Sequence, residues 1–181
     1  MSEQKSKAML LSDAFGYLFA GEVLLLQRIA RELPAGSIVV NLGSGTGTSS
    51  LAVIEANPDV VLYTVDISPG GPLGGLENEW NAFQNAGIPF KHQQILGDAI
   101  DVGRGWNKGK ITLLIVDDDH SYDHVLEEIK VWKKHVDTGS LVLFHDYESA
   151  NWADVVRVVD ETMSEEEFVE KVDTYALYRI R

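Results

Sequence analysis

Short apolar, β-branched runs alternate along the chain with stretches of helical periodicity. The runs predicted as strands are Ile38 to Leu42, Val60 to Val65, Phe90 to Ile95, Ile111 to Val116 and Leu141 to Phe144. Helices are predicted over residues 49–56, 121–135 and 153–162. Strands that are apolar throughout are buried on both faces, which indicates a parallel sheet covered by helices on each side. The pattern therefore predicts an α/β fold.

The two ends of the chain add leading helices and a closing hairpin. Apolar residues recur at helical spacing before Pro34, and the residues expected to face the core are Leu18, Leu24, Leu25 and Ile29. One or two leading helices over residues 1–34 then precede an α/β core over residues 37–181. Residues 168–172 and 175–180 are predicted to pair as an antiparallel edge hairpin. A chain of 181 residues leaves little length for a second domain, so a single domain over residues 1–181 is expected.

The helix predicted over residues 121–135 has one clear buried side. Ser121 is a suitable N-cap, and Val125, Ile129 and Trp132 form the stripe expected to face the sheet. The charged residues of this helix are expected to form an ordinary solvated face. His124, near the start of the helix, is accordingly expected at the surface.

Charge and composition narrow the function classes. Acidic residues outnumber basic ones by 28 to 15, which gives a formal net charge of -13 and a pI near 4.7. Such a chain repels a phosphate backbone, so we expect no nucleic-acid partner. The absence of cysteine excludes disulfides, thiolate metal sites and a cysteine nucleophile. The polar start and the lack of a membrane-length apolar run predict a cytoplasmic protein without membrane contact.

An apolar strand runs directly into a glycine turn and a helix start over residues 39–50. Gly43, Gly45 and Gly47 allow the backbone to lie against a flat nucleoside, and the helix start offers free N–H groups. Asp66 ends the second strand roughly twenty residues later, where a carboxylate can accept hydrogen bonds from both ribose hydroxyls. These features predict a nucleotide-like ligand site at the carboxyl ends of the strands.

Two further positions bear on the nature of this ligand. A dinucleotide fingerprint requires a third glycine where this chain has Thr48, which counts against NAD. Asp98 follows the candidate third strand, where it would either lie near an adenine amino group or cap a helix. The alternative to a ligand site is an ordinary strand-to-helix turn in which Asp66 caps the next segment.

Carboxylates and imidazoles follow two further strands at the same expected rim. Residues 117–119 are three consecutive aspartates followed by His120, and His145 and Asp146 follow the next strand. Asp117, His120 and Asp146 are expected to be functional, whereas Asp118 and Asp119 are expected to be solvated charges or caps. A bound Mg²⁺ or Mn²⁺ would compensate the clustered charge. His120 is the natural general base, because its unperturbed pKa is near 6.5.

These motifs together resemble class I S-adenosylmethionine-dependent methyltransferases, most closely the branch related to macrolide-sugar O-methyltransferases and cephalosporin-hydroxylase-type proteins. The resemblance rests on residues 41–47, Asp66, residues 116–122 and residues 139–146. It implies a Rossmann-like, doubly wound, mostly parallel sheet of seven strands with the last antiparallel. It also implies a set of cofactor-binding residues: Asn41, Gly43, Ser44, Gly45, Gly47, Thr48, Asp66, Asp98 and Asp117.

The resemblance further implies a metal site and a catalytic pair. Asp117, His145 and Asp146 occupy the positions that bind the ion in metal-dependent members, and His120 occupies the position of the base. Two residues depart from the family pattern. Asn41 stands where the family usually has an acidic residue, and His145 stands where metal-binding relatives usually have a carboxylate.

The leading hypothesis is an S-adenosylmethionine-dependent O-methyltransferase that acts on a small-molecule hydroxyl with His120 and Asp117 as catalytic residues. The enzyme alternative is an NAD-dependent oxidoreductase at the same site. The non-enzyme alternative is a cofactor-binding partner protein of the same fold, which Asn41 and His145 keep open. The sheet and its helices use nearly the whole chain, so cover for the acceptor is expected from a homodimer partner, from the leading helices, or from loops at residues 68–75, 97–109 and 147–152.

Overall fold

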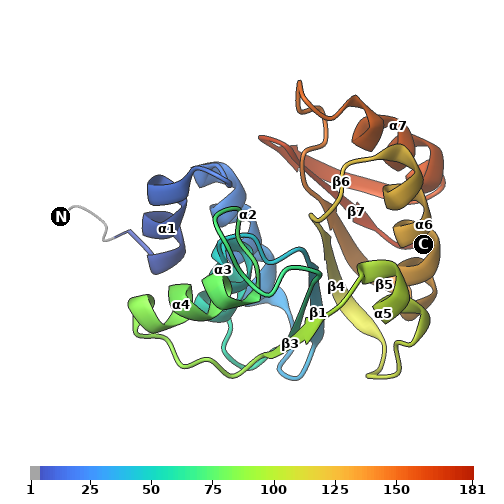
Figure 1. Cartoon of the computed structure of the whole chain (residues 1–181). Helices are drawn as coiled ribbons and strands as arrows, with labels where there is room; N and C mark the ends of the chain where they lie inside the picture. Colours follow the sequence, from blue (N-terminus) through green and yellow to red (C-terminus); the bar gives the residue numbers. More distant parts are fainter. Residues whose placement is uncertain (1–4) are drawn as a thin grey trace.

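The computed structural model describes residues 5–181 and has one central sheet with helices on both faces (Figure 1). The strands are β1 (Ile38–Leu42), β2 (Val61–Asp66), β3 (Gln93–Leu96), β4 (Ile111–Val116), β5 (Val136–Phe144), β6 (Glu167–Val172) and β7 (Tyr175–Arg179). The α-helices are α1 (Lys7–Phe15), α2 (Ala20–Glu32), α3 (Thr48–Ala56), α4 (Leu76–Ala86), α5 (Ala99–Arg104), α6 (Tyr122–Trp132) and α7 (Ala153–Met163), and a 3-10 turn, η1 (Lys133–His135), follows α6.

The sheet has seven strands in the order β3-β2-β1-β4-β5-β7-β6. β1 pairs in parallel with β2 on one side and with β4 on the other, so the winding of the sheet reverses between β1 and β4. Ligands of open α/β sheets bind beside such a reversal, at the carboxyl ends of the strands. β7 runs antiparallel to both β5 and β6. The predicted doubly wound sheet with an antiparallel last strand is therefore confirmed, with β6 rather than β7 at its edge.

Two apolar cores lie on opposite faces of the sheet. Helices α1 to α4 cover one face and α5 to α7 cover the other (Figure 1). On the second face Trp132 and Phe144 are fully buried, and burial of such a side chain contributes about 1.5–3 kcal/mol. The predicted stripe of α6 is confirmed, because Val125 and Ile129 are buried beside Trp132.

The leading helices show one wrong prediction. Leu18, Leu25 and Ile29 are buried as expected, but Leu24 is 54% exposed. The buried arc of α2 is wide, and Leu24 lies on the opposite side of the helix from its centre; the buried residues are Glu22, Val23, Leu25, Leu26, Gln27, Ile29 and Ala30. Glu22, which the pattern did not place in the core, is fully buried on this side of α2.

Several element boundaries differ from the sequence prediction. Residues 97–109, predicted as a loop, contain α5, and the unpredicted helix α4 follows the glycine-rich segment 68–75. β3 begins at Gln93, because the ladder starts where it meets Tyr63 of β2. None of the helices described over residues 5–181 has the length and apolar character needed to cross a membrane.

Candidate active site

The glycine turn meets the acidic rim at the reversal between β1 and β4. Gly43 has a φ of +84°, and a Cβ on it would lie 2.1 Å from the carbonyl oxygen of Asp117. Only glycine allows the end of β1 to pass this close to the end of β4. Gly45 has a φ of +48°, and within residues 5–181 no atom lies within 4 Å of its Cβ position. The turn therefore presents one packed side and one open side.

Asp66 ties two loops together at the end of β2. Its Oδ2 accepts hydrogen bonds from the backbone N–H and the hydroxyl of Ser44, at 2.7 and 2.5 Å. Its Oδ1 accepts from the backbone N–H of Ser68 at 2.7 Å. A carboxylate has about four acceptor sites, so one site is left for a further donor. Binding both ribose hydroxyls, as the sequence predicts, requires the Ser44 hydroxyl to turn away.

Other predicted cofactor residues lie beneath or beside the turn. Asn41 is fully buried, and its Nδ2 donates to the Ser50 hydroxyl at 3.1 Å, while its Oδ1 has no partner within residues 5–181. Thr48 is buried in the first turn of α3, and its hydroxyl lies 3.0 Å from that of Thr46. Asp98 caps α5 by accepting from the Asp101 N–H at 3.0 Å. Contact between these residues and a cofactor stays a prediction.

His120 and Asp146 come together from the loops that follow β4 and β5. The Nε2 of His120 lies 2.8 Å from Oδ2 of Asp146. Asp146 has a φ of 56°, a conformation that costs an ordinary residue of order 1–3 kcal/mol and is concentrated at functional sites. Burial alone would raise the pKa of Asp146, but hydrogen bonds and charge from His120 and His145 hold it well below its usual range. Asp146 is therefore ionised at neutral pH and orients the His120 ring.

His145 lies between three carboxylates. Its Nδ1 is 2.8 Å from Oδ1 of Asp117 and 3.4 Å from Oδ2 of Asp146, and its Nε2 is 3.6 Å from Oε2 of Glu22. Burial favours the neutral ring, but the charge and hydrogen bond of Asp117, together with Asp146 and Glu22, outweigh it and raise the pKa far above its usual range. The ring is therefore an imidazolium at neutral pH.

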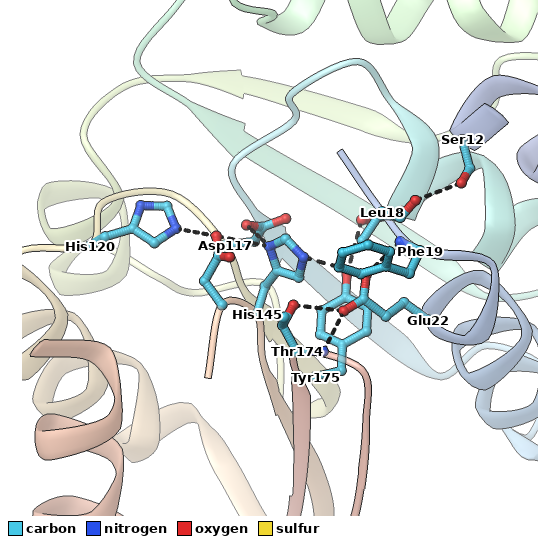
Figure 2. Close-up of polar contacts among 11 residues, drawn as sticks. Ser12, Leu18, Phe19, Glu22, Asp117, His120, His145, Thr174 and Tyr175 are labelled. Atoms are coloured by element: carbon cyan, nitrogen blue, oxygen red, sulfur yellow. Dashed lines mark hydrogen bonds and ion pairs between the residues drawn. The ribbon is translucent and has the colours of Figure 1, made fainter. Parts of the chain in front are cut away.

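Glu22 is a functional-site residue that the sequence analysis missed. Figure 2 shows the contacts that run from His120 through His145 to Glu22 on α2. One Glu22 oxygen accepts from the N–H and hydroxyl of Thr174 at 2.8 and 2.7 Å, and the other accepts from the Phe19 N–H at 2.7 Å. Burial opposes ionisation, but these bonds and His145 lower the pKa of Glu22. The sequence signal that could have identified Glu22 was the presence of a carboxylate among the apolar residues on the buried side of a predicted helix.

The predicted metal ligands Asp117, His145 and Asp146 lie side by side, but His145 does not suit a cation. A metal-binding imidazole is neutral and offers a free nitrogen. Both ring nitrogens of His145 instead face carboxylates, Nδ1 that of Asp117 and Nε2 that of Glu22. The metal-compatible group at this rim combines Asp117, His120 and Asp146, which each place one ligand atom within 4.8 Å of the others. A divalent ion held by His145 stays a prediction that the donor set disfavours.

An open cleft lies beside His120, between the loop after β4 and the segment that precedes α7. It has a volume of about 630 Å³ and is lined by Asp118, Asp119, His120, Ser121, Asn151, Trp152, Ala153 and Asp154. The Trp152 ring stacks on His120, with 4.5 Å between ring centroids and 26° between planes. The cleft can hold a small molecule against the aromatic ring of Trp152 and beside the imidazole of His120. Trp152 was expected only as part of a specificity loop, because its stacking depends on a contact distant in sequence.

The nature of the reaction follows from comparison with known proteins. A family model described as a methyltransferase domain matches residues 40–147, which include the glycine turn and the His120 rim. The chain belongs to this methyltransferase family. With its fold, it is a class I S-adenosylmethionine-dependent methyltransferase, so the NAD-dependent alternative is set aside. A comparison with curated proteins finds no match.

Solved structures similar to this methyltransferase share its fold at low sequence identity. The cofactor-bound structure of Rv0187 from MTB is 19% identical, with a TM-score of 0.74 over 96% of this chain and 88% of the other. The O-methyltransferase TomG from Streptomyces achromogenes, in complex with SAM, is 18% identical, with a TM-score of 0.73 over 98% and 91%. SAH-bound PaMTH1 from Podospora anserina is 13% identical, with a TM-score of 0.72 over 98% and 89%.

Proposed function

We propose that this methyltransferase moves the methyl group of S-adenosylmethionine to a hydroxyl of a small molecule, with His120 as the general base. The observation that carries the proposal is the His120–Asp146 pair at 2.8 Å, on the rim where Gly43 touches Asp117. A glycine turn for the cofactor and an oriented imidazole for the acceptor thus share one edge of the sheet. Methyl transfer to oxygen needs both elements.

Three features of the chain suit the cofactor. The open side of Gly45 leaves room for an adenosyl group, and Asp66 retains an acceptor site for a ribose hydroxyl. Ile67 and Leu96 are exposed apolar side chains that follow or end the paired strands β2 and β3, and they offer a surface for a flat base. When bound, S-adenosylmethionine supplies an electrophilic methyl on a sulfonium.

The proton of the acceptor hydroxyl is assigned to His120. An imidazole beside an ionised carboxylate accepts a proton readily, and general-base catalysis of this kind contributes about 10²–10⁴-fold in rate. Asp146 holds the ring and stabilises the imidazolium that forms. The Trp152 wall of the cleft places an acceptor next to His120.

The His145 imidazolium supplies positive charge at the rim, where the sequence predicts that a bound metal ion supplies it. Three carboxylates converge there, and the buried imidazolium compensates part of their charge. Asp117 is thereby held in place at the end of β4, against the glycine turn. No step of the proposed reaction depends on a divalent ion. Mg²⁺ or Mn²⁺ assistance stays a prediction, and turnover in excess chelator tests it.

Calorimetry with S-adenosylmethionine and with its demethylated product tests the cofactor half of the proposal. We expect both to bind, and failure of both to bind at millimolar concentration overturns it. Transfer of a labelled methyl group to a panel of sugar and phenol hydroxyls tests the other half. His120→Gln should lower turnover by about 10²–10⁴-fold with unchanged cofactor affinity. The matched control His135→Gln, at η1 away from the cleft, should retain full turnover.

The homodimer and the cytoplasmic location stay predictions. The cleft beside His120 is open, so a second copy would supply the cover that the chain itself does not provide. Light scattering tests the dimer: a monomer that turns over substrate at the full rate rules it out.

A further inference from the structure

A second cluster of ligand-type side chains lies on the α6 face of the sheet. Asp118 stands in the loop after β4, and His124 and Glu128 are one turn apart on α6. Positions i and i+4 project from the same side of a helix. Each of the three residues places one ligand atom within 4.8 Å of the others. The Nε2 of His124 lies 3.5 Å from Oδ2 of Asp118.

The cluster contains buried polar atoms that lack partners. Glu128 is 0% exposed, and its carboxylate oxygens face the carboxylate of Asp118 rather than an N–H or O–H donor within residues 5–181. The Nε2 atom of His124 is also buried and makes no hydrogen bond within this part of the chain, although it lies 3.5 Å from Asp118. Buried polar groups without a hydrogen bond destabilise the fold, and charged ones do so more strongly. A native fold keeps this arrangement when something else satisfies them.

The solvated face predicted for α6 is wrong at Glu128. Glu128 lies three residues after Val125 and four before Trp132, so it shares their buried side. Burial raises the pKa of Glu128 well above its usual range, and the charge of Asp118 raises it further. Burial also raises the pKa of Asp118. The nearby Asp119 and Asp98 add further negative charge around Glu128.

We propose that Asp118, His124 and Glu128 bind a transition-metal dication of the Zn²⁺ type, at a site separate from the catalytic rim. Two carboxylates and one imidazole form a mixed oxygen and nitrogen donor set, which favours Zn²⁺ over Mg²⁺ or Ca²⁺. Tetrahedral Zn²⁺ with bonds near 2.0–2.2 Å places neighbouring ligand atoms roughly 3.3–3.6 Å apart. The spacing between His124 and Asp118 already matches this. The fourth position would be filled by solvent from the cleft that Asp118 lines.

The ion would act as a clip between a loop and a helix. Asp118 lies between Asp117 and His120 in the chain, so fixing it to α6 fixes the loop that carries the proposed base. Ion binding can be measured apart from the proposed reaction, because the three side chains are not those of the His120–Asp146 pair. Its test therefore needs no acceptor.

The test is a titration of the full chain with metal ion, after any bound metal has been removed with a chelator. Co²⁺ replaces Zn²⁺ and its visible absorption reports coordination, with Zn²⁺ added afterwards as competitor. We expect one Co²⁺ per chain with a four-coordinate spectrum, displaced by Zn²⁺ and not by Mg²⁺. His124→Ala and Glu128→Gln should each weaken binding at least tenfold. Asp119→Asn, in the same loop but outside the ligand set, is the matched control and should bind as the parent does.

The rim provides the competing site, and Asp117→Asn separates the two. Binding that survives Asp117→Asn and fails in His124→Ala supports the proposal. Binding that is lost only in Asp117→Asn, or that is the same in His124→Ala as in the parent, overturns it. The absence of any Co²⁺ or Zn²⁺ binding also overturns it and leaves Glu128 as a protonated buried acid. Circular dichroism verifies folding, and the partly exposed His124 carries the test where Glu128→Gln unfolds.

Discussion

Replacing Gly43 by alanine tests the contact that joins the cofactor turn to the catalytic rim. The new Cβ would lie 2.1 Å from the carbonyl oxygen and 2.8 Å from the carbonyl carbon of Asp117. Both are backbone atoms between paired strands, so β1 and β4 must shift apart at their ends. Gly45→Ala is the matched control, because its Cβ would meet no atom within 4 Å among residues 5–181.

The expected magnitudes follow from two terms. A left-handed φ costs alanine about 1–2 kcal/mol, and both variants carry this cost. Overpacking adds about 1–3 kcal/mol in Gly43→Ala alone. The loss of unfolded-state entropy that accompanies Gly→Ala is shared and cancels in the comparison. Gly43→Ala should therefore lower the free energy of unfolding by about 2–5 kcal/mol, against about 1–2 kcal/mol for Gly45→Ala.

Urea denaturation followed by circular dichroism measures the difference. For a chain of this size each kcal/mol lowers the melting temperature by about 2–4 °C, so a thermal scan gives an independent reading. Equal stability of the two variants would refute the contact between the turn and Asp117. Relative to the stability that each variant loses, Gly45→Ala should lose more affinity for S-adenosylmethionine than Gly43→Ala. The reason is that the Gly45 Cβ enters the space proposed for the adenosyl group. Gly45→Ala that binds S-adenosylmethionine as tightly as the parent contradicts that placement.

Glu22→Gln should lower the free energy of unfolding by about 1.5–3 kcal/mol, because it removes one of the three carboxylates that face the His145 imidazolium. A loss below about 1 kcal/mol in urea denaturation contradicts the pairing. Because folding lowers the pKa of Glu22, the ionised carboxylate stabilises the fold above the unfolded pKa of about 4.3, and this stabilisation is lost as pH falls through the folded pKa. Urea denaturation at a series of pH values between 7 and 3 should therefore show a smaller loss of unfolding free energy on acidification in Glu22→Gln than in the parent. Trp152→Ala should raise the KM for the acceptor and leave cofactor affinity unchanged, and steady-state kinetics with a constant KM would remove Trp152 from the cleft wall.

Local pattern was sufficient for the features that depend on neighbouring residues. The β1 strand, the turn through Gly43 and Gly45, and the start of α3 are consecutive in the chain, and their apolar, glycine and helix signals overlap without conflict. Parallel strands end at one edge, so the order of elements also placed Asp117 and His120 on the same rim as the glycine turn. The family resemblance rested on these same segments, and the family match confirms it.

Only the tertiary structure decided which charged side chains, distant in sequence, lie next to one another. Glu22 and His145 come from a leading helix and a late strand, and their contact depends on how α2 packs beside the β6–β7 turn that carries Thr174. Periodicity identifies a buried side of a helix, but it does not say whether a charged residue there faces an opposite charge, as Glu22 does, or other carboxylates, as Glu128 does. Protonation and ligand binding follow from that environment, because burial and neighbouring charge act through distance in space and not along the chain.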